Sequence, residues 1–234
     1  MYMKKNFFIV AVAALLAVSC NFAVTGGKVI KGSGVTESRT LSLPEFNSIS
    51  VLGSMDVFYT QGPQEVVLTA DDNLLDYYKV EVIDGVLTIG TEKGVSISSS
   101  KNAPFLTVSA GDLSGMSVHG SGDCNINGPF RTEGDCSFIV AGSGDLEADA
   151  IDCARFISKV RGSGDVDVDA LTCKSAELSV AGSGDISVCC KDAGDITVRI
   201  QGSGDITLTG TASSLTSNTS CRTPLCSISD SGRT

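Results

Sequence analysis

Several residue types that build catalytic and binding sites are rare or missing in this 234-residue chain. It has no tryptophan and one histidine, and aromatic residues make up 6% of it. A Ser-His-Asp triad would have to use His119, which lies in Gly115-Met116-Ser117-Val118-His119, one residue short of the G-x-S-x-G pattern. A zinc site is disfavoured as well, because histidine is scarce and Cys189-Cys190 is not a C-x-x-C pair. These absences argue against an enzyme.

Positive charge is also scarce. The chain has 17 Lys and Arg residues against 27 Asp and Glu, a net charge of −10. If the N-terminal segment with Lys4 and Lys5 is removed as a signal peptide, 15 basic residues remain against 27 acidic ones, a net charge of −12. An acidic chain without basic clusters is not expected to bind nucleic acid or to bind anionic membranes electrostatically, and it should also repel acidic polysaccharide.

The most informative feature that is present is a repeat of Gly-Ser-Gly-Asp. Its five copies begin at positions 120, 142, 162, 182 and 202, at intervals of 22, 20, 20 and 20 residues. A strict period of this length indicates a supersecondary unit stacked on copies of itself.

Each unit alternates apolar and polar residues after the motif, as in Asp165-Val166-Asp167-Val168, and again in Ala176-Leu178-Val180. This is the period of half-buried strands, so we expect two strands and two turns per unit. No helix separates the units, so equivalent strands can only stack in parallel. The sequence therefore predicts an all-β fold, a parallel β-helix of about 20 residues per coil.

Equivalent positions of successive units should form inward columns. Two apolar columns and one of small residues are expected: Cys124, Leu146, Val166, Ile186 and Ile206; Ile126, Ala148, Val168, Val188 and Leu208; and Gly128, Ala150, Ala170, Cys190 and Gly210. The glycines of the motif suit a corner that needs positive φ or close backbone approach. The Asp that follows can accept hydrogen bonds from nearby backbone amides.

The N-terminus has the order of an export signal. Lys4 and Lys5 precede the apolar run 7–18, which is too short to span a bilayer, and small residues follow it. Cys20 directly after them resembles a bacterial lipobox, which implies cleavage after residue 19 and a membrane anchor through a lipid on Cys20. An ordinary signal peptide with an incidental cysteine remains the alternative. The predicted segments are a signal peptide over 1–19, a flexible tether over 20–40, a β-helix domain over 41–210 and an irregular cap or tail over 211–234.

Residues 41–118 carry a weakened form of the repeat. Gly53-Ser54-Met55-Asp56-Val57 echoes the motif, and strands are expected near Val66-Leu68, Val80-Val82 and Val86-Ile89, with a turn at Asp84-Gly85. We expect this part to form less regular first coils and a cap.

These motifs resemble a known family. The repeated Gly-Ser-Gly-Asp-Ile/Val, the segment Phe46–Gly53 and the segments Asp71–Leu75 and Val82–Ile89 are similar to the putative auto-transporter adhesin, head GIN-domain family, over about residues 40–210. The resemblance implies a right-handed parallel β-helix and an exported bacterial lipoprotein. It brings no catalytic residues.

Nine cysteines are many for this length. Cys153 and Cys173 are one repeat apart and should stack, and Cys124, Cys136 and Cys190 fall on inward positions, where a free thiol acts as a small apolar side chain. Cys221 and Cys226 lie in the non-repetitive tail. A disulfide between them is one possibility in an oxidising, exported location.

An acidic patch is the one candidate ligand site. Six carboxylates fall on outward positions of two adjacent coils: Asp145, Glu147, Asp149, Asp165, Asp167 and Asp169. Their repulsion could be relieved by Ca²⁺, which prefers oxygen ligands, or by water alone. We expect the solvated face.

The sequence thus predicts an exported, lipid-anchored interaction protein, adhesin-like and without catalysis or cofactor, on the periplasmic side or the cell surface. A protein or a glycan is the expected ligand. The alternative is a carbohydrate-active enzyme, a polysaccharide lyase or hydrolase, because parallel β-helices also carry such activities with paired carboxylates.

Overall fold

The computed structural model describes residues 28–98 and 102–219. Cys20, the signal peptide, Cys221 and Cys226 lie outside these ranges. Within them, no helix has the length and apolar character needed to cross a membrane.

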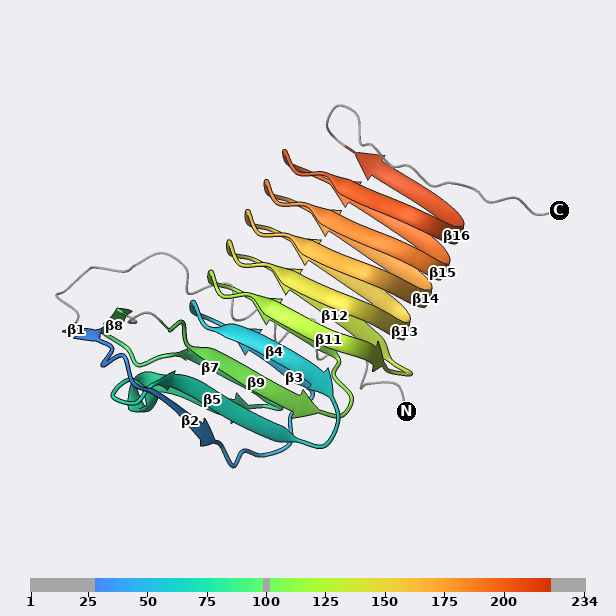
Figure 1. Ribbon diagram of the computed structural model, residues 1–234. Coiled ribbons are helices and arrows are strands. Elements are labelled where there is room, and N and C mark those ends of the chain that lie inside the picture. The colour runs from blue at the N-terminus through green and yellow to red at the C-terminus, as the bar shows by residue number, and fades with distance from the viewer. Residues whose placement is uncertain (1–27, 99–101, 220–234) are drawn as a thin grey trace.

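The second half of the chain is a regular parallel β-helix (Figure 1). Its coils are built on β13 (Leu146–Val160), β14 (Val166–Val180), β15 (Ile186–Ile200) and β16 (Ile206–Thr219). Each strand pairs in parallel with the next, and Val166 lies beside Leu146 on one side and Ile186 on the other. The predicted fold is confirmed. The two strands expected per coil are one continuous strand instead.

Each long strand bends at two corners, where the in-and-out alternation skips a step. In β13, Asp149 and Ala150 both point outward, and so do Ala154 and Arg155. The corners divide a coil into face 1 (146–148 and equivalents), face 2 (151–153) and face 3 (156–160), and the Gly-Ser-Gly-Asp turn joins face 3 to the next face 1.

The first two predicted columns form the core of face 1, because every member is buried. The third column is wrong except at Cys190, which is buried. Ala150 and Ala170 are partly exposed, and the corner moves the inward position to the following residue. The buried column there is Phe130, Ile151, Leu171 and Cys190.

The glycines of the turns are needed for close packing rather than for an unusual backbone. Positive φ occurs at Gly128 and Gly210, but at no glycine of the five motifs. A Cβ built on Gly164 would lie 2.1 Å from the carbonyl oxygen of Gly144 in the coil before it. The turns therefore stack backbone against backbone, which leaves no room for a side chain.

The N-terminal part extends the same stack from shorter strands. Beyond β13, face 1 continues through β11 (Cys124–Arg131), β4 (Asp56–Gln61), β9 (Phe105–Ala110), β5 (Glu65–Asp71) and β2 (Thr36–Thr40). Face 3 continues through β12 (Asp135–Val140), β10 (Gly115–Val118), β3 (Ser48–Val51), β7 (Val86–Thr91) and β6 (Tyr78–Ile83). The last strands at this end, β5, β2 and β6, pair antiparallel and close it. A two-stranded sheet of β1 (Lys28–Lys31) and β8 (Val95–Ser98) and the 3₁₀ helix η2 (Leu75–Tyr77) complete the cap.

Several boundaries differ from those expected. Residues 28–31 and 36–40 were assigned to the tether, but they form β1 and β2, and Asn73 holds the loop between them by donating to the Lys31 carbonyl (2.9 Å). At the other end, β16 pairs with β15 as far as Thr219, so the regular ladder extends nine residues past the expected boundary at 210. The turn at Asp84-Gly85 is confirmed, with φ of 51° and 79° as in a tight hairpin.

Candidate functional site: the outward faces of the solenoid

The Asp of each repeat has a structural role. Asp145 Oδ1 accepts a hydrogen bond from the amide of Asp165 (2.8 Å), and Asp165 Oδ1 accepts one from the amide of Asp185 (2.7 Å). The same contact joins Asp56 to Asp123, Asp123 to Asp145 and Asp185 to Asp205. We call this row the aspartate ladder. The prediction that these residues bond backbone amides is confirmed, although the amide belongs to the next coil rather than to the same turn.

Two of the six predicted cation ligands, Asp145 and Asp165, accept backbone hydrogen bonds in the aspartate ladder. A third, Asp149, accepts a hydrogen bond from the Gly128 amide through Oδ2 (2.6 Å). Glu147 and Asp167 are neighbours in register, and both point outward from face 1. Within residues 28–98 and 102–219, no three acidic, histidine or cysteine side chains converge as metal ligands would. The solvated face stays the prediction for this patch, and calcium binding stays its alternative.

The surroundings of Asp167 shift its pKa. Partial burial raises its pKa above the ordinary value, and the charges of Asp165, Asp145 and Asp169 add to the rise, while a hydrogen bond with Ser187 opposes it. The carboxyl is thus easier to protonate than a free aspartate.

Face 3 carries a groove of mixed charge that the sequence analysis missed. Its volume is about 540 Å³, and it is lined by Arg155, Ser175, Ala176, Glu177, Leu178, Ser179, Asp195, Thr197 and Arg199. Arg155 Nη2 lies 2.8 Å from Glu177 Oε2, and Lys159 Nζ lies 3.8 Å from Glu177 Oε1. Arg199 forms no ion pair with any described residue, so a cation is available beside two hydroxyl side chains, Ser179 and Thr197.

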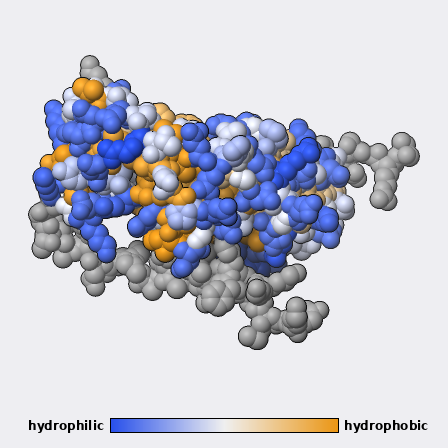
Figure 2. All heavy atoms as spheres, turned by 90° about the horizontal axis from the view of Figure 1, so that it is seen from below, coloured by the Kyte–Doolittle hydropathy of each residue, from blue (hydrophilic) through white to orange (hydrophobic). Residues whose placement is uncertain are grey.

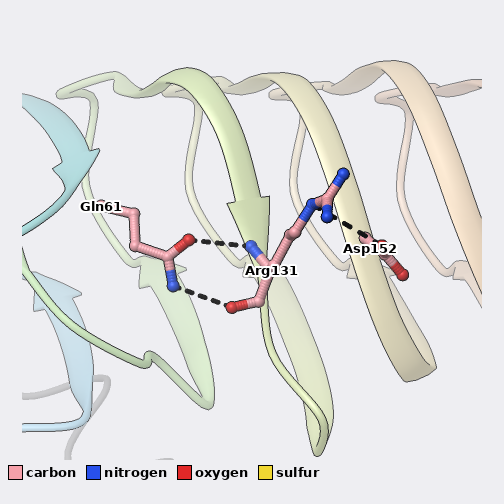
Figure 3. Close-up of polar contacts among 3 residues, drawn as sticks. All are labelled: Gln61, Arg131 and Asp152. Atoms are coloured by element: carbon pink, nitrogen blue, oxygen red, sulfur yellow. Dashed lines mark hydrogen bonds and ion pairs between the residues drawn. The ribbon is translucent and has the colours of Figure 1, made fainter.

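A second, more open groove of about 710 Å³ lies where the regular coils meet the N-terminal part. Its lining includes Asp112, Arg131, Glu133, Asp152 and Lys174. The Gln61 side chain fixes the backbone of Arg131, since its Nε2 donates to the carbonyl (2.8 Å) and its Oε1 accepts from the amide (3.0 Å), as Figure 3 shows. The Arg131 guanidinium reaches toward Asp152 at 3.8 Å. Both partners are exposed, so this ion pair contributes little stability.

The six described cysteines are outside any disulfide. Cys153 and Cys173 stack in register as predicted, and Cys124, Cys136 and Cys190 are buried. Burial raises the pKa of Cys153 to about 12, and that of Cys136 is also raised by burial. Cys189 points outward, and a hydrogen bond with Thr209 is the main cause of its lowered pKa. The buried thiols are core side chains, as expected.

His119 does not assemble a triad. It is partly buried at the turn after β10, and burial, with the charge of Arg161, lowers its pKa. Ser117 donates to the Ile49 carbonyl at 3.5 Å rather than to the imidazole.

The exposed apolar side chains gather at the N-terminal end. The five large ones among the described residues are Val29, Val35, Leu52, Phe58 and Ile83. In the view of Figure 2, the broadest hydrophobic area likewise lies over the half of the molecule that holds the N-terminal strands. The regular coils present a mostly hydrophilic surface.

Three solved structures share this architecture. An adhesin from Bacteroides fragilis, named as putative, has a TM-score of 0.69 at 21% identity, covering 85% of this chain and 98% of its own. Two proteins from Parabacteroides distasonis follow: one named a putative lipid binding protein (TM-score 0.60, 24% identity, 86% and 98% coverage) and one named a putative adhesin (0.58, 21%, 86% and 99%). At these identities the likeness shows the fold alone. No curated protein matches the chain.

The family is shown by the sequence. The family model described as "Putative auto-transporter adhesin, head GIN domain" matches residues 45–213, which span the core of the solenoid and most of the N-terminal strands. The chain therefore belongs to the auto-transporter adhesin, head GIN-domain family.

Proposed function

We propose that this protein is an exported, lipid-anchored binding protein that presents its solenoid to a ligand at the cell envelope. The observation that carries the proposal is the match to an adhesin head domain over residues 45–213. The architecture supports it, because nearly all inward positions are filled by packed side chains and only the outward rows are free to meet a ligand.

The anchor would set the orientation of the molecule. The described strands begin at Lys28, and seven residues lie between it and Cys20, so the chain could span at most about 28 Å from Cys20 to Lys28. The cap formed by β1, β2 and β5 would then lie close to the membrane, and β16 would lie at the far end of the stack (Figure 1).

The anchor has a direct test. Cys20→Ser should leave an unprocessed or soluble form, because no described helix offers a second anchor. Fractionation into membrane and soluble protein measures this. Processed protein that remains in the membrane fraction would rule the lipid anchor out.

The face 3 groove is the ligand site we propose. The chain is acidic overall, but Arg199 provides a local positive charge in this groove that can bind a carboxylate or sulfate of an acidic glycan, while Ser179 and Thr197 bind its hydroxyls. The groove lacks aromatic side chains for stacking, so charge and hydrogen bonds would supply the specificity.

A panel of acidic and neutral oligosaccharides tests this site. Arg199→Ala should weaken binding of acidic members at least about tenfold, the loss expected for a charged hydrogen bond. Arg161→Ala removes the same charge from an exposed position outside the groove and should bind like the parent chain. Equal losses in both variants would point to net charge rather than to the groove.

The carbohydrate-active enzyme remains the second candidate because of one observation. Asp167, with its raised pKa, lies beside Glu147 on the adjacent strand, as in a pair of a general acid and a carboxylate. Reducing-end release measured on the same panel decides between the two classes. Turnover that disappears in Asp167→Asn would establish the enzyme.

A further inference from the structure

The cap carries exposed apolar side chains at one end of the molecule. Val29 in β1, Val35 before β2 and Ile83 at the end of β6 have 69%, 60% and 50% of their surface exposed. β2 and β6 are the terminal strands of faces 1 and 3, and β1 and β8 lie at the same end of the stack, opposite β16 (Figure 1). Among the described residues from 146 onward, no large apolar side chain is exposed in this way. Single exposed apolar residues are ordinary on a protein surface, but their restriction to one end indicates a contact site.

The two valines are carried outward by hydrogen-bonded backbone. Ile30 and its partner in β8, Ile97, both pack against the core. Because side chains alternate along a strand, Val29 points away from the core. The carbonyl of Val35 accepts a hydrogen bond from the amide of Asp72 (2.8 Å), which fixes the loop before β2. The exposure of both valines is thus a property of the fold.

The polar residues beside the valines are of the kinds found at a membrane surface. Lys28 and Lys31 flank Val29 in β1, and Lys28 Nζ lies 5.7 Å from the centre of the Tyr77 ring. A lysine can lay its aliphatic stem along apolar surface and keep its ammonium group at the lipid headgroups, where tyrosine is also enriched. The net charge of −10 disfavours an anionic surface, so a zwitterionic bilayer is the matching one.

The place of the anchor selects a lipid surface over other occupants of this end. Seven residues lie between Cys20 and Lys28, so a lipid on Cys20 would keep β1 within about 28 Å of the membrane. The anchor and the exposed valines are then on the same side of the molecule. A few apolar side chains bind a bilayer weakly on their own, but a short tether raises their effective concentration at its surface.

We propose that the cap rests directly on the bilayer that holds the anchor. The contact surface, called the cap surface below, consists of the exposed apolar residues and the polar residues that flank them: Val29, Val35, Ile83, Lys28, Lys31 and Tyr77. This proposal rests on the lipid anchor of the proposed function and adds a second, noncovalent contact to it. The contact sets the direction of the solenoid, with β16 farthest from the membrane.

Single tryptophans test the contact, because the chain has none of its own. Val29→Trp and, at the far end, Thr207→Trp are compared in the full lipidated chain on phosphatidylcholine vesicles with brominated acyl chains, which quench nearby tryptophan. Val29→Trp should lose at least about half of its fluorescence relative to unbrominated vesicles, because it lies at the boundary of headgroups and acyl chains. Thr207→Trp should lose less than about a tenth, since it stays in water.

A charge on the cap surface separates this contact from the preference of tryptophan itself for membranes. In the Val35→Trp chain, Val29→Asp should reduce the quenching at least about threefold, because a carboxylate is unfavourable in the apolar boundary. Leu52→Asp is the matched control, since Leu52 is also exposed but follows β3, outside the cap surface. It should leave the quenching of Val35→Trp unchanged. Equal losses of quenching in the two variants would point to net charge and overturn the proposal.

Flotation with the vesicles reports the anchor separately. A chain that floats while Val29→Trp stays unquenched keeps the anchor and overturns the membrane contact. A blue-shifted but unquenched Val29→Trp overturns it in favour of a protein cover, and a shift that grows with protein concentration identifies a second copy. Quenching of Thr207→Trp equal to that of Val29→Trp contradicts the orientation. A chain that does not float lacks the anchor, and the membrane contact fails with it.

Discussion

The turn at Gly53-Ser54-Met55-Asp56 and the five Gly-Ser-Gly-Asp turns are the same structure with different demands on the sequence. A Cβ on Gly120 would lie 1.8 Å from the Gly53 carbonyl oxygen, and a Cβ on Gly122 would lie 2.2 Å from that of Met55. A Cβ on Gly53 itself meets nothing within 4 Å. Glycine is therefore required where another turn lies directly underneath, and the first turn of the stack has none.

This difference explains why the repeat fades in the N-terminal part. Met55, at the position of the second glycine, keeps its side chain and buries it, with 3% exposed. Below this turn, face 1 continues through β9 and face 3 through β7, which are joined by the long segment 92–104 instead of a tight turn. Where the chain does not stack on a copy of itself, the period has no physical cause.

The largest effect is expected from glycine substitutions that separate the two regions. Gly164→Ala should lower the free energy of unfolding by about 3 kcal/mol or more, because its Cβ overlaps a backbone carbonyl that cannot move away cheaply. Gly53→Ala should change it by less than about 0.5 kcal/mol. Urea unfolding of both variants measures the difference. Equal losses would mean that the glycines serve the turn conformation rather than the stacking.

The second largest loss of stability is expected from a substitution in the N-terminal part. Tyr59 is fully buried, and its hydroxyl donates to the carbonyls of Ala110 (2.9 Å) and Gly111 (2.7 Å). Tyr59→Phe should cost about 1–2 kcal/mol, because these carbonyls lose a donor away from water.

Tyr78→Phe provides the comparison from the same region. Tyr78 has 9% of its surface exposed, and none of the side-chain hydrogen bonds within residues 28–98 and 102–219 involves its hydroxyl. Tyr78→Phe should lower the free energy of unfolding by less than about 0.5 kcal/mol. Thermal unfolding of the two variants measures this difference. A larger loss of stability in Tyr78→Phe than in Tyr59→Phe would contradict the prediction.

The sequence predicted the regular coils well because each residue there is constrained by a neighbour at the equivalent position in the coil above and in the coil below. The apolar columns and the stacking of Cys153 on Cys173 follow directly from the period. The third column of inward residues was predicted wrongly because each corner adds one outward residue. A strict alternation of inward and outward residues does not predict that extra residue. β2 was missed because Thr36-Glu37-Ser38-Arg39-Thr40 is exposed throughout and is held by backbone pairing with β5.

The candidate site could not be predicted in the same way. The groove on face 3 combines Arg155, Glu177 and Arg199 from three successive coils, and the motif search centred on the Asp rows of face 1. A signal was present, since Lys159 and Arg199 are separated by two periods and thus share one outward row.

A smaller effect is expected from the aspartate ladder, which both regions share. Asp165→Ala and Asp56→Ala should each cost about 1 kcal/mol, because the amides of Asp185 and Asp123 lose their acceptors. Guanidinium unfolding at pH 7 measures both. If only Asp165→Ala is destabilising, the ladder does not continue into the N-terminal part as a stabilising element.

Asp167→Asn should have the opposite sign. The pKa of Asp167 is raised in the folded state, so the unfolded carboxyl ionises first as the pH rises, and the folded state loses stability above the ordinary pKa of 3.8. The substitution removes this loss. We expect a gain of a few tenths of a kcal/mol at pH 7 and none near pH 2.5, where both states are protonated.

The smallest effect is expected from calcium. If Glu147, Asp149, Asp167 and Asp169 are solvated, added calcium chloride should raise the melting temperature no more than sodium chloride at equal ionic strength, because both salts only screen repulsion. A bound cation would act differently, since a ligand that binds only the folded state stabilises it by mass action. Asp167→Asn combined with Asp169→Asn would then abolish the calcium-specific part while leaving the aspartate ladder intact. A calcium-specific rise that vanishes in this double variant would establish a metal site on face 1 of the regular coils, with no equivalent in the N-terminal part, where Phe58 occupies the row of Glu147.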